Sequence, residues 1–220
     1  MRLILVRHGQ TYNNASNTID TIYPGAVLTE EGWTQANDVV GTLLGFEPGA
    51  VWASNLTRTQ QTATPLATRL GLDINVHDGF REIEAGTFEG GTSDAHYRGY
   101  SEIIVDWIQG DMDAPLGADP AVTGTTVLER FDDAVRAAED QGAATVVVFA
   151  HAAVISFWVG MRGGVTVEKE DFIPLANTGI VALSGSLDEG YHLESWMHVN
   201  HKLPDDGPMK ELAEEISDEL

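Results

Sequence analysis

Residues 1–9 read Met-Arg-Leu-Ile-Leu-Val-Arg-His-Gly, an apolar run that ends in an arginine, a histidine and a glycine. The apolar residues do not alternate with polar ones, which is typical of a strand covered on both faces in a parallel sheet. Ligands of such sheets bind beyond the carboxyl ends of the strands, where Arg7 and His8 stand. A guanidinium can bind phosphate oxygens, an imidazole can act as a nucleophile, and Gly9 allows the backbone to approach a ligand closely. The stretch therefore predicts a buried strand that carries a phosphate-binding group.

The chain has 220 residues and 43% hydrophobic content, which fits a globular protein of one domain or of one domain with an insertion. It contains no cysteine, so disulfides, thiolate metal ligands and a cysteine nucleophile are excluded. The N-terminal residues lack the pattern of a signal peptide, and no apolar run has the length of a membrane span. These observations predict a soluble, cytoplasmic protein.

Acidic residues outnumber basic residues by 34 to 12, which gives a formal net charge of -22 at pH 7. A field of this sign repels nucleic acids and anionic membranes, so we expect neither as a partner. A phosphate ester is also repelled at long range, but salt screens charges beyond about 10 Å at 0.1 M. A few arginines gathered in one place can therefore dominate locally. Part of the acidic excess lies in residues 200–220, which we interpret as a solvated C-terminal tail.

Helix and strand patterns alternate along the chain. Thr29, followed by two glutamates, predicts the start of a helix whose apolar face includes Trp33 and whose end is Gly45. A second helix is predicted to contain a kink at Pro65 and to end at Gly71. No repeat or linker divides the chain, so these elements belong to one unit.

The remaining patterns indicate an α/β protein. Strands are predicted at 50–53, 145–149, 180–183 and 192–199, and helices at 57–70, 103–108, 128–138 and 152–159. Residues 84–120 are rich in Gly, Asp and Pro and interrupt the alternation, as an insertion or lid does. The order of the elements is typical of a doubly wound sheet.

Three predicted strands end in polar residues. Arg7 and His8 follow the first strand, and Ser54 follows the second, with Arg58 one helical turn later. His151 follows the strand at 145–149. Taken alone, Arg58 would be an ordinary surface residue and His151 a buried core histidine. Because all three strand ends are expected at one edge of the sheet, the sequence favours a shared site.

Four groups of residues occur in order along the chain. They are Arg7-His8-Gly9-Gln10-Thr11 followed by Asn14; Ser54-Asn55-Leu56-Thr57-Arg58 with Gln61-Thr62-Ala63; Arg81-Glu82-Ile83 with Gly86 and Phe88-Glu89-Gly90; and Val148-Phe149-Ala150-His151. Together they resemble the motifs of the histidine phosphatase superfamily, in its phosphoglycerate mutase-like branch. The resemblance implies a three-layer α/β/α fold over residues 1–199, with a mostly parallel, doubly wound sheet, helices on both faces and a lid-like insertion at about 84–120.

The resemblance also implies roles for individual residues. His8 is expected to attack phosphorus and form a phosphohistidine, while Glu82 first donates and then accepts a proton. The phosphoryl oxygens are expected to be held without a metal or cofactor, because guanidinium and imidazole groups supply the charge. The expected substrate-binding residues are Arg7, Asn14, Arg58, His151, Gly9, Gln10, Thr11 and Arg81, of which Arg7, Arg58 and His151 are also expected to be catalytic.

Other candidates for these roles exist. Glu84 and Glu89 compete with Glu82 for the acid role, and Glu82 is favoured because it follows Arg81 in the motif. A metal site is also conceivable at three histidines of the C-terminal region, but their spacing in a strand and loop makes packing or surface roles the better interpretation. These histidines are His192, His198 and His201.

The chain departs from the family pattern at three places. Ala152 and Ala153 stand where relatives carry two glycines, and Asn13 replaces a usual tryptophan. A Gly-Thr-Thr sequence at 124–126 replaces a common Gly-Glu-Ser. We therefore expect substrate contacts that differ from those of well-known members.

The shortage of basic residues favours hydrolysis over phosphoryl exchange. A mutase that handles bisphosphorylated glycerate needs additional cations, yet residues 84–120 contain only Arg98, and Arg81 and Arg162 are the other spare arginines. The sequence predicts a phosphatase acting on a small phosphorylated metabolite, with a small-molecule phosphate ester as its partner. A cofactor-dependent phosphoglycerate mutase and a non-catalytic phospholigand-binding protein are the alternatives.

Overall fold

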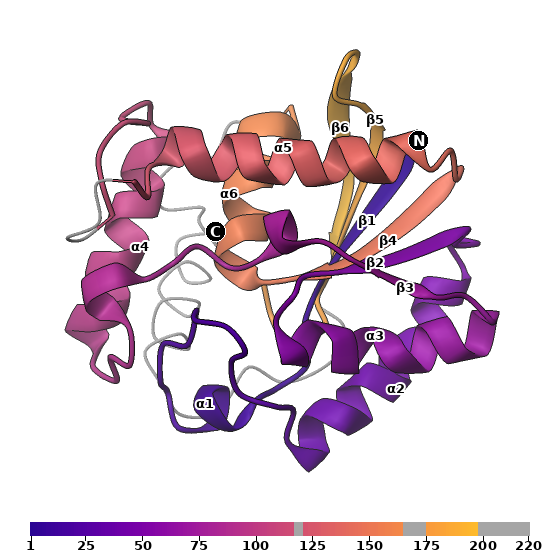
Figure 1. Ribbon diagram of the computed structural model, residues 1–220, viewed down its shortest axis with the longest axis horizontal. Coiled ribbons are helices and arrows are strands. Elements are labelled where there is room, and N and C mark those ends of the chain that lie inside the picture. Colours follow the sequence, from indigo (N-terminus) through magenta and orange to yellow (C-terminus); the bar gives the residue numbers. More distant parts are fainter. Residues whose placement is uncertain (117–120, 165–174, 198–220) are drawn as a thin grey trace, which may run out of the picture.

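The computed structural model describes residues 1–116, 121–164 and 175–197. Its sheet has the strand order β3-β2-β4-β1-β5-β6 (Figure 1). The strands are β1 (Arg2–Arg7), β2 (Ala50–Ala53), β3 (Ile74–Val76), β4 (Thr145–Ala150), β5 (Ile180–Ser186) and β6 (Gly190–Met197). The helices are α1 (Tyr12–Ala15), α2 (Glu30–Leu44), α3 (Thr57–Leu70), α4 (Asp94–Ile108), α5 (Gly124–Asp140) and α6 (Ala152–Arg162), with short 3-10 turns at Asp78–Phe80 and Gly86–Phe88.

The central part of the sheet is parallel. β1 and β2 both pair with β4, and β3 extends the sheet beyond β2 in the same direction. β5 is antiparallel to β1 and forms a hairpin with β6 at the other edge. Because Arg7 pairs with Ala150 and Ala53 pairs with Phe149, the three strands end at one edge, as the sequence predicted.

Helices cover both faces of the sheet, so the predicted three-layer arrangement is confirmed. Figure 1 shows α2 and α3 on one side and α5 with α6 on the other. Ile4 and Val6 of β1 pack with the first layer, whereas Leu3 and Leu5 pack with the second. This two-sided burial explains why β1 reads as a continuous apolar run.

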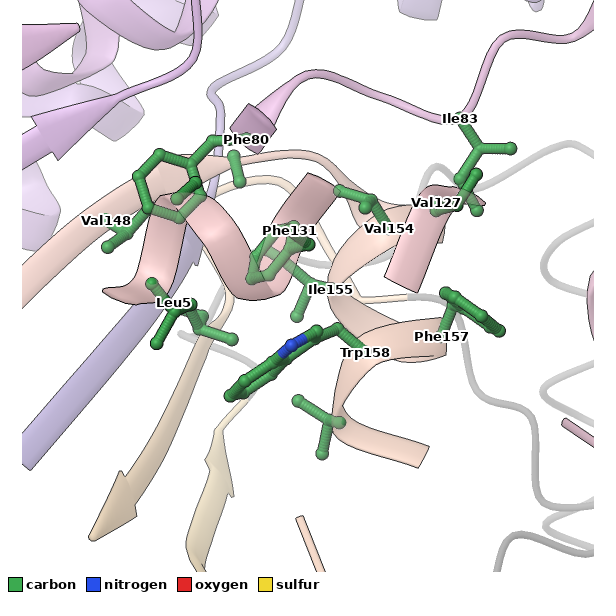
Figure 2. Packing of buried hydrophobic residues seen from close by; sticks show 14 of the residues in the cluster. Leu5, Phe80, Ile83, Val127, Phe131, Val148, Val154, Ile155, Phe157 and Trp158 are labelled. Atoms are coloured by element: carbon green, nitrogen blue, oxygen red, sulfur yellow. The ribbon is translucent and has the colours of Figure 1, made fainter. Parts of the chain in front are cut away.

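The larger core lies between the sheet and helices α4, α5 and α6. Figure 2 shows Phe131 of α5 close to Trp158 of α6, and their ring centroids are 5.3 Å apart. Phe80 packs edge-on against Phe131 from the segment that follows β3. This core therefore attaches the connection after β3 to the helical layer.

Several predicted elements differ in detail. The buried face of α2 contains Ala36, Val39 and Leu43, whereas Trp33 is 37% exposed, because it lies beside that stripe of residues. The helix expected at 103–108 is the end of α4, which begins much earlier at a capping box on Ser93. β3 was not predicted, since three residues give little periodic signal.

The ends of the predicted helices are mostly confirmed. Thr29 caps α2, and Gly71 ends α3 in the left-handed conformation at φ 67°. α3 is continuous through Pro65. The predicted acidic tail at 200–220 lies outside the described residues, as do His198 and His201. No helix in the described ranges is both long and apolar enough to cross a membrane.

Candidate active site

Side chains that follow β1, β2 and β4 lie in contact at the edge of the sheet. His151 Nε2 lies 2.8 Å from Ser54 Oγ, and Arg58 Nε donates to His151 Nδ1 at 3.2 Å. The rings of His8 and His151 meet edge to face, with centroids 5.2 Å apart. His8, Arg58 and His151 are 4%, 2% and 0% exposed. The structure thus brings together the predicted strand-end residues in a buried cluster.

The protonation of His8 follows from its hydrogen bond. Its Nδ1 lies 2.8 Å from the carbonyl oxygen of Gly9. A carbonyl only accepts, so Nδ1 carries the proton and the lone pair of the neutral ring is on Nε2. Burial, together with the charges of Arg58 and Arg7, holds the pKa of His8 well below its usual value of 6.5. His8 is therefore neutral, with a nucleophilic Nε2, at neutral pH.

Arg7 and Arg58 bring positive charge into this buried region. Arg7 donates from one terminal nitrogen to the carbonyl of Leu175 at 2.6 Å, but its buried Nε has no hydrogen-bond partner among the described residues. An unpaired buried donor is costly, which makes it a natural ligand for an incoming oxygen. Burial lowers the pKa of Arg7 to about 10, so the guanidinium keeps its charge at neutral pH.

The side chain of Glu82 contacts the first turn of α6, the helix that begins immediately after His151. Its Oε1 accepts from the backbone N–H groups of Ile83 and Val154 at 2.9 Å, and its Oε2 accepts from Ala153 at 3.2 Å. Burial raises the pKa of Glu82 above its ordinary value, although these three donors and Arg58 oppose the shift. The carboxyl is therefore suited to carry a proton, and the expected acid lies next to the second histidine.

The two competing glutamates have structural partners. Glu84 pairs with Arg81 at 2.7 Å and with Arg130 at 3.9 Å. Glu89 accepts from the backbone N–H of Thr21 at 3.0 Å. These contacts connect the segment around Glu82 to its neighbours and leave Glu82 as the carboxyl beside His151.

Arg130 of α5 supports the backbone that carries Glu82. Its guanidinium donates to the carbonyls of Gly79, Arg81 and Glu82 at 2.7 to 2.9 Å. Burial lowers its pKa to about 10. The family motif points to Glu82 itself but gives no indication of Arg130, because the two are far apart in sequence. The predicted substrate-binding residue Arg81 is bound to Glu84.

The loop after His8 is held by protein contacts. The backbone N–H of Gly9 donates to Thr62 Oγ1 at 3.0 Å, and a Cβ at Gly9 would lie 2.6 Å from the carbonyl oxygen of Gly32. Thr29 Oγ1 donates to Gln10 Oε1 at 2.9 Å. Thr11 caps α1 by accepting from the backbone of residue 14. A substrate contact of Gly9, Gln10 or Thr11 stays a prediction.

Asn14 and Asn177 meet behind His8. Asn14 Oδ1 accepts from the backbone of Thr11 at 3.1 Å and from Asn177 Nδ2 at 3.4 Å. Asn177 Nδ2 also donates to the carbonyl of His8 at 3.0 Å. The side-chain nitrogen of Asn14, Nδ2, has no partner among the described residues. The predicted hydrogen bond from Asn14 to a phosphate oxygen would use this atom. Sequence analysis missed Asn177, whose only signal is its place just before a predicted strand.

Within the described ranges, no group of three or more His, Asp and Glu side chains is arranged to hold a metal ion. His192 lies on β6 and is exposed, away from the cluster that follows β1, β2 and β4. Of the three histidines considered for a metal site, the structure describes only His192, and this residue gives no support for such a site.

An α/β sheet with two histidines, two arginines and a loop glutamate gathered beyond the ends of its parallel strands is the arrangement expected of a phosphate-handling protein. The chain belongs to the histidine phosphatase superfamily, branch 1, whose family model matches residues 3–198. The family predicted from the four motifs is thereby confirmed.

Two curated proteins are similar to this chain in sequence. The chain is 34% identical over 207 residues to the PE-PGRS family protein PE_PGRS11 of Mycobacterium tuberculosis, covering 87% of this chain and 35% of that protein. It is 24% identical over 189 residues to putative phosphoserine phosphatase 2 of Hydrogenobacter thermophilus, covering 83% and 88%. The chain thus spans about a third of the length of the first relative.

Solved structures share the fold. A mycobacterial glucosyl-3-phosphoglycerate phosphatase in complex with inorganic phosphate superimposes with a TM-score of 0.69 at 25% identity, covering 89% of this chain and 96% of that chain. A structure described as mycobacterial hydrolase 1 gives a TM-score of 0.73 at 25% identity, covering 89% and 97%. These neighbours contain a phosphatase that binds phosphate on the same fold.

Proposed function

We propose that this protein is a phosphomonoester phosphatase that acts on a small phosphorylated metabolite through a phosphohistidine on His8. The observation that carries the proposal is a neutral His8 whose Nε2 is free to react beside two guanidinium groups. Phosphoryl transfer depends mainly on positioning and on stabilising negative charge, and this arrangement supplies both.

In the first step, the Nε2 lone pair of His8 forms a bond to phosphorus while the bond from phosphorus to the alcohol oxygen breaks. Glu82 gives its proton to that oxygen, so a neutral alcohol leaves and a carboxylate remains. The raised pKa of Glu82 supports this role, because a buried carboxyl keeps its proton at a higher pH than an exposed one. Arg7 and Arg58 neutralise the charge of the phosphoryl oxygens.

In the second step, the Glu82 carboxylate takes a proton from water, and the water oxygen attacks phosphorus. The bond between phosphorus and His8 Nε2 breaks, phosphate leaves, and both residues return to their starting protonation states. Water is the co-substrate of the second step, and the two steps balance without a metal or a redox group. The Nδ1–H bond to the Gly9 carbonyl fixes the ring throughout the cycle.

The role of His151 depends on its tautomer. In the structure its Nδ1 accepts from Arg58, so its Nε2 carries the proton and donates to Ser54. The Ser54 hydroxyl can also donate to Nε2, and His151 then carries its proton on Nδ1. We propose that phosphate binding draws Arg58 Nε away from Nδ1 and selects this second form, in which Nδ1 donates to a phosphoryl oxygen.

Hydrolysis is favoured over mutase activity by the partners of the nearby arginines. Arg81 and Arg130 are both paired with Glu84, and Arg162, at the C-terminal end of α6, is paired with Asp132. A second phosphate on the substrate would therefore meet cations that are already neutralised.

The cytoplasmic location expected from the sequence remains a prediction, which cell fractionation would test.

The proposal is tested by measuring phosphate release from a panel of small phosphomonoesters in the presence of a metal chelator. The native protein is compared with His8→Ala. We expect release by the native protein only, and a phosphorylated protein that is stable in alkali and labile in acid, as phosphohistidine is. Full activity of His8→Ala would overturn the mechanism. If the native protein released no phosphate from any ester, exchange between glycerate phosphates with a bisphosphate primer would test the mutase alternative.

A further inference from the structure

An acidic residue that the family motifs do not include contacts Arg58. The carbonyl oxygen of Asp20 accepts from one terminal nitrogen of Arg58 at 2.9 Å, and the Asp20 carboxylate lies 3.5 Å from the other. Asp20 is only slightly exposed, and its Oδ2 also accepts from the backbone of Ala26 at 2.8 Å. The loop that carries Asp20 therefore reaches the same guanidinium that faces His151.

The loop is closely fitted to this contact. Gly25 has a φ of 72°, and a Cβ at this position would lie 2.4 Å from a terminal nitrogen of Arg58. The backbone N–H of Thr57, at the start of α3, donates to the carbonyl of Pro24 at 3.0 Å. Because both ends of the contact are held, the carboxylate of Asp20 stays beside Arg58 rather than turning into solvent.

The two carboxylate oxygens of Asp20 differ in their contacts. Asp20 Oδ1 has no hydrogen-bond partner among the described residues, while Oδ2 has two. A carboxylate with an open oxygen beside a phosphate-binding guanidinium accepts from a hydroxyl and repels an anion. Any group of the substrate that lies close to the phosphate therefore meets this charge.

We propose that Asp20 is a specificity-determining residue, which makes the site prefer monoesters with a neutral, hydroxyl-bearing alcohol over monoesters that carry a second anion near the phosphate. The inference rests on the proposed function, since it concerns the substrate of the same site. It explains how a chain with a net charge of -22 uses one of its acids close to its phosphate-binding arginine.

Several arginines outside the site are already paired with acids. Among the described residues, the arginines outside the site that face acids are Arg2, Arg81, Arg130, Arg136 and Arg162. Glu82 and Glu89 also act electrostatically on Arg58, in the same direction as Asp20. A carboxylate on the substrate would thus add a negative charge beside the Asp20 carboxylate, whereas Glu82 is protonated at the start of the proposed reaction.

Two nearly isosteric esters test the inference. Glycerol 3-phosphate carries a neutral hydroxymethyl group where 3-phosphoglycerate carries a carboxylate. The ratio of their kcat/KM values therefore measures the preference for a neutral alcohol. We expect the native protein to favour glycerol 3-phosphate, and Asp20→Asn to reduce this ratio by about tenfold, the effect of one like-charge pair at a partly buried site. Asparagine keeps an acceptor for Ala26, so the loop retains its contact.

Two further variants separate charge from folding. Asp20→Glu restores the charge and should restore the preference, whereas Asp38→Asn, on the exposed face of α2, removes one charge elsewhere and should leave the ratio unchanged. An unchanged ratio in Asp20→Asn, or an equal loss in Asp38→Asn, would overturn the inference. A ratio that Asp20→Glu fails to restore would assign Asp20 a purely structural role and also overturn it.

A binding measurement separates this inference from the proposed function. Calorimetric titration of His8→Ala and of the His8→Ala, Asp20→Asn double variant with the two esters needs no turnover. If the native protein releases no phosphate, the proposed function fails, yet the same tenfold change in relative affinity would still support the role of Asp20. Equal relative affinities in the two variants would overturn that role even if the native protein is an active phosphatase.

Discussion

The site has two halves that are built differently. The strand-end half consists of Arg7, His8, Ser54, Arg58 and His151, which end or follow adjacent parallel strands or lie in the first turn of the helix after them. The loop half consists of Asp20 and Glu82, which stand on irregular segments between elements. The first half is fixed by the register of the sheet, whereas the second depends on individual side-chain contacts. In the proposed mechanism, the sheet therefore positions the groups that attack and hold the phosphate, and the loops carry the proton donor and the residue proposed to select the substrate.

The loop half has supports of its own. The segment that carries Glu82 is held by Arg130 from α5. The loop that carries Asp20 contacts the residues just after Glu82, because the backbone of Thr21 donates to Glu89. Thr21 Oγ1 also accepts from the backbone of Ala85 at 2.9 Å. The segments that carry Asp20 and Glu82 are therefore in direct contact.

The largest expected effect lies in the strand-end half. His8→Asn should lower kcat by about ten-thousandfold or more, because no other residue is proposed to form the covalent intermediate. Steady-state kinetics and labelling of the protein by a phosphate donor measure this loss. His192→Asn, on the exposed part of β6, is the matched control and should keep native activity. A His8 variant that still becomes labelled would place the nucleophile elsewhere.

The next largest effect tests the loop half. Glu82→Gln should lower kcat by about a hundredfold to a thousandfold, while inorganic phosphate should inhibit with little change, since the variant removes a proton donor and leaves the arginines. Glu84→Gln is the control, because Glu84 is already bound to Arg81. If Glu84→Gln lost as much activity, the acid role would belong to that residue.

The pH dependence distinguishes the two halves. The pKa of His8 is lowered, so His8 stays neutral and kcat/KM should persist well below pH 6.5. The pKa of Glu82 is raised above 4.5, so kcat/KM should fall on the alkaline side as Glu82 loses its proton. We expect Glu82→Gln to lack this alkaline fall. An alkaline fall that persists in Glu82→Gln would assign it to another group.

A smaller effect is expected when the hydroxyl of Ser54, which contacts His151, is removed. Ser54→Ala removes the partner of His151 Nε2, which leaves both tautomers of the ring without support from this side. We expect kcat/KM to fall by about tenfold, the size of one hydrogen bond to a buried polar group. A value of kcat/KM equal to the native value would mean that the tautomer of His151 has no bearing on turnover.

The smallest effect is expected at Arg81. Its guanidinium is paired with Glu84 and partly exposed, so Arg81→Ala should change kcat/KM by less than about threefold. The measurement decides whether the predicted substrate contact of Arg81 exists. A larger loss, confined to KM, would show that Arg81 turns toward the substrate and would extend the loop half.

The strand-end half was largely predictable from the sequence, because β1 and β4 are apolar runs that end directly in Arg7, His8 and His151. Glu82 was predictable only through the family resemblance, since nothing in its local pattern separates it from Glu84. Asp20 and Asn177 were missed, because their importance arises from contacts between distant segments. Trp33 was misplaced, since a shift of one position on a helix changes the side that a residue faces.

The carboxyl of Glu82 does more than hold a proton, because it also closes the first turn of α6 by accepting from Ala153 and Val154. A group with a raised pKa favours folding below its unfolded-state pKa and loses that contribution as the pH rises through its folded-state pKa. The proton that serves the proposed reaction is therefore linked to the fold itself. In alkaline solution, the free energy of unfolding and the proposed activity should therefore fall together as the buried carboxyl loses its proton.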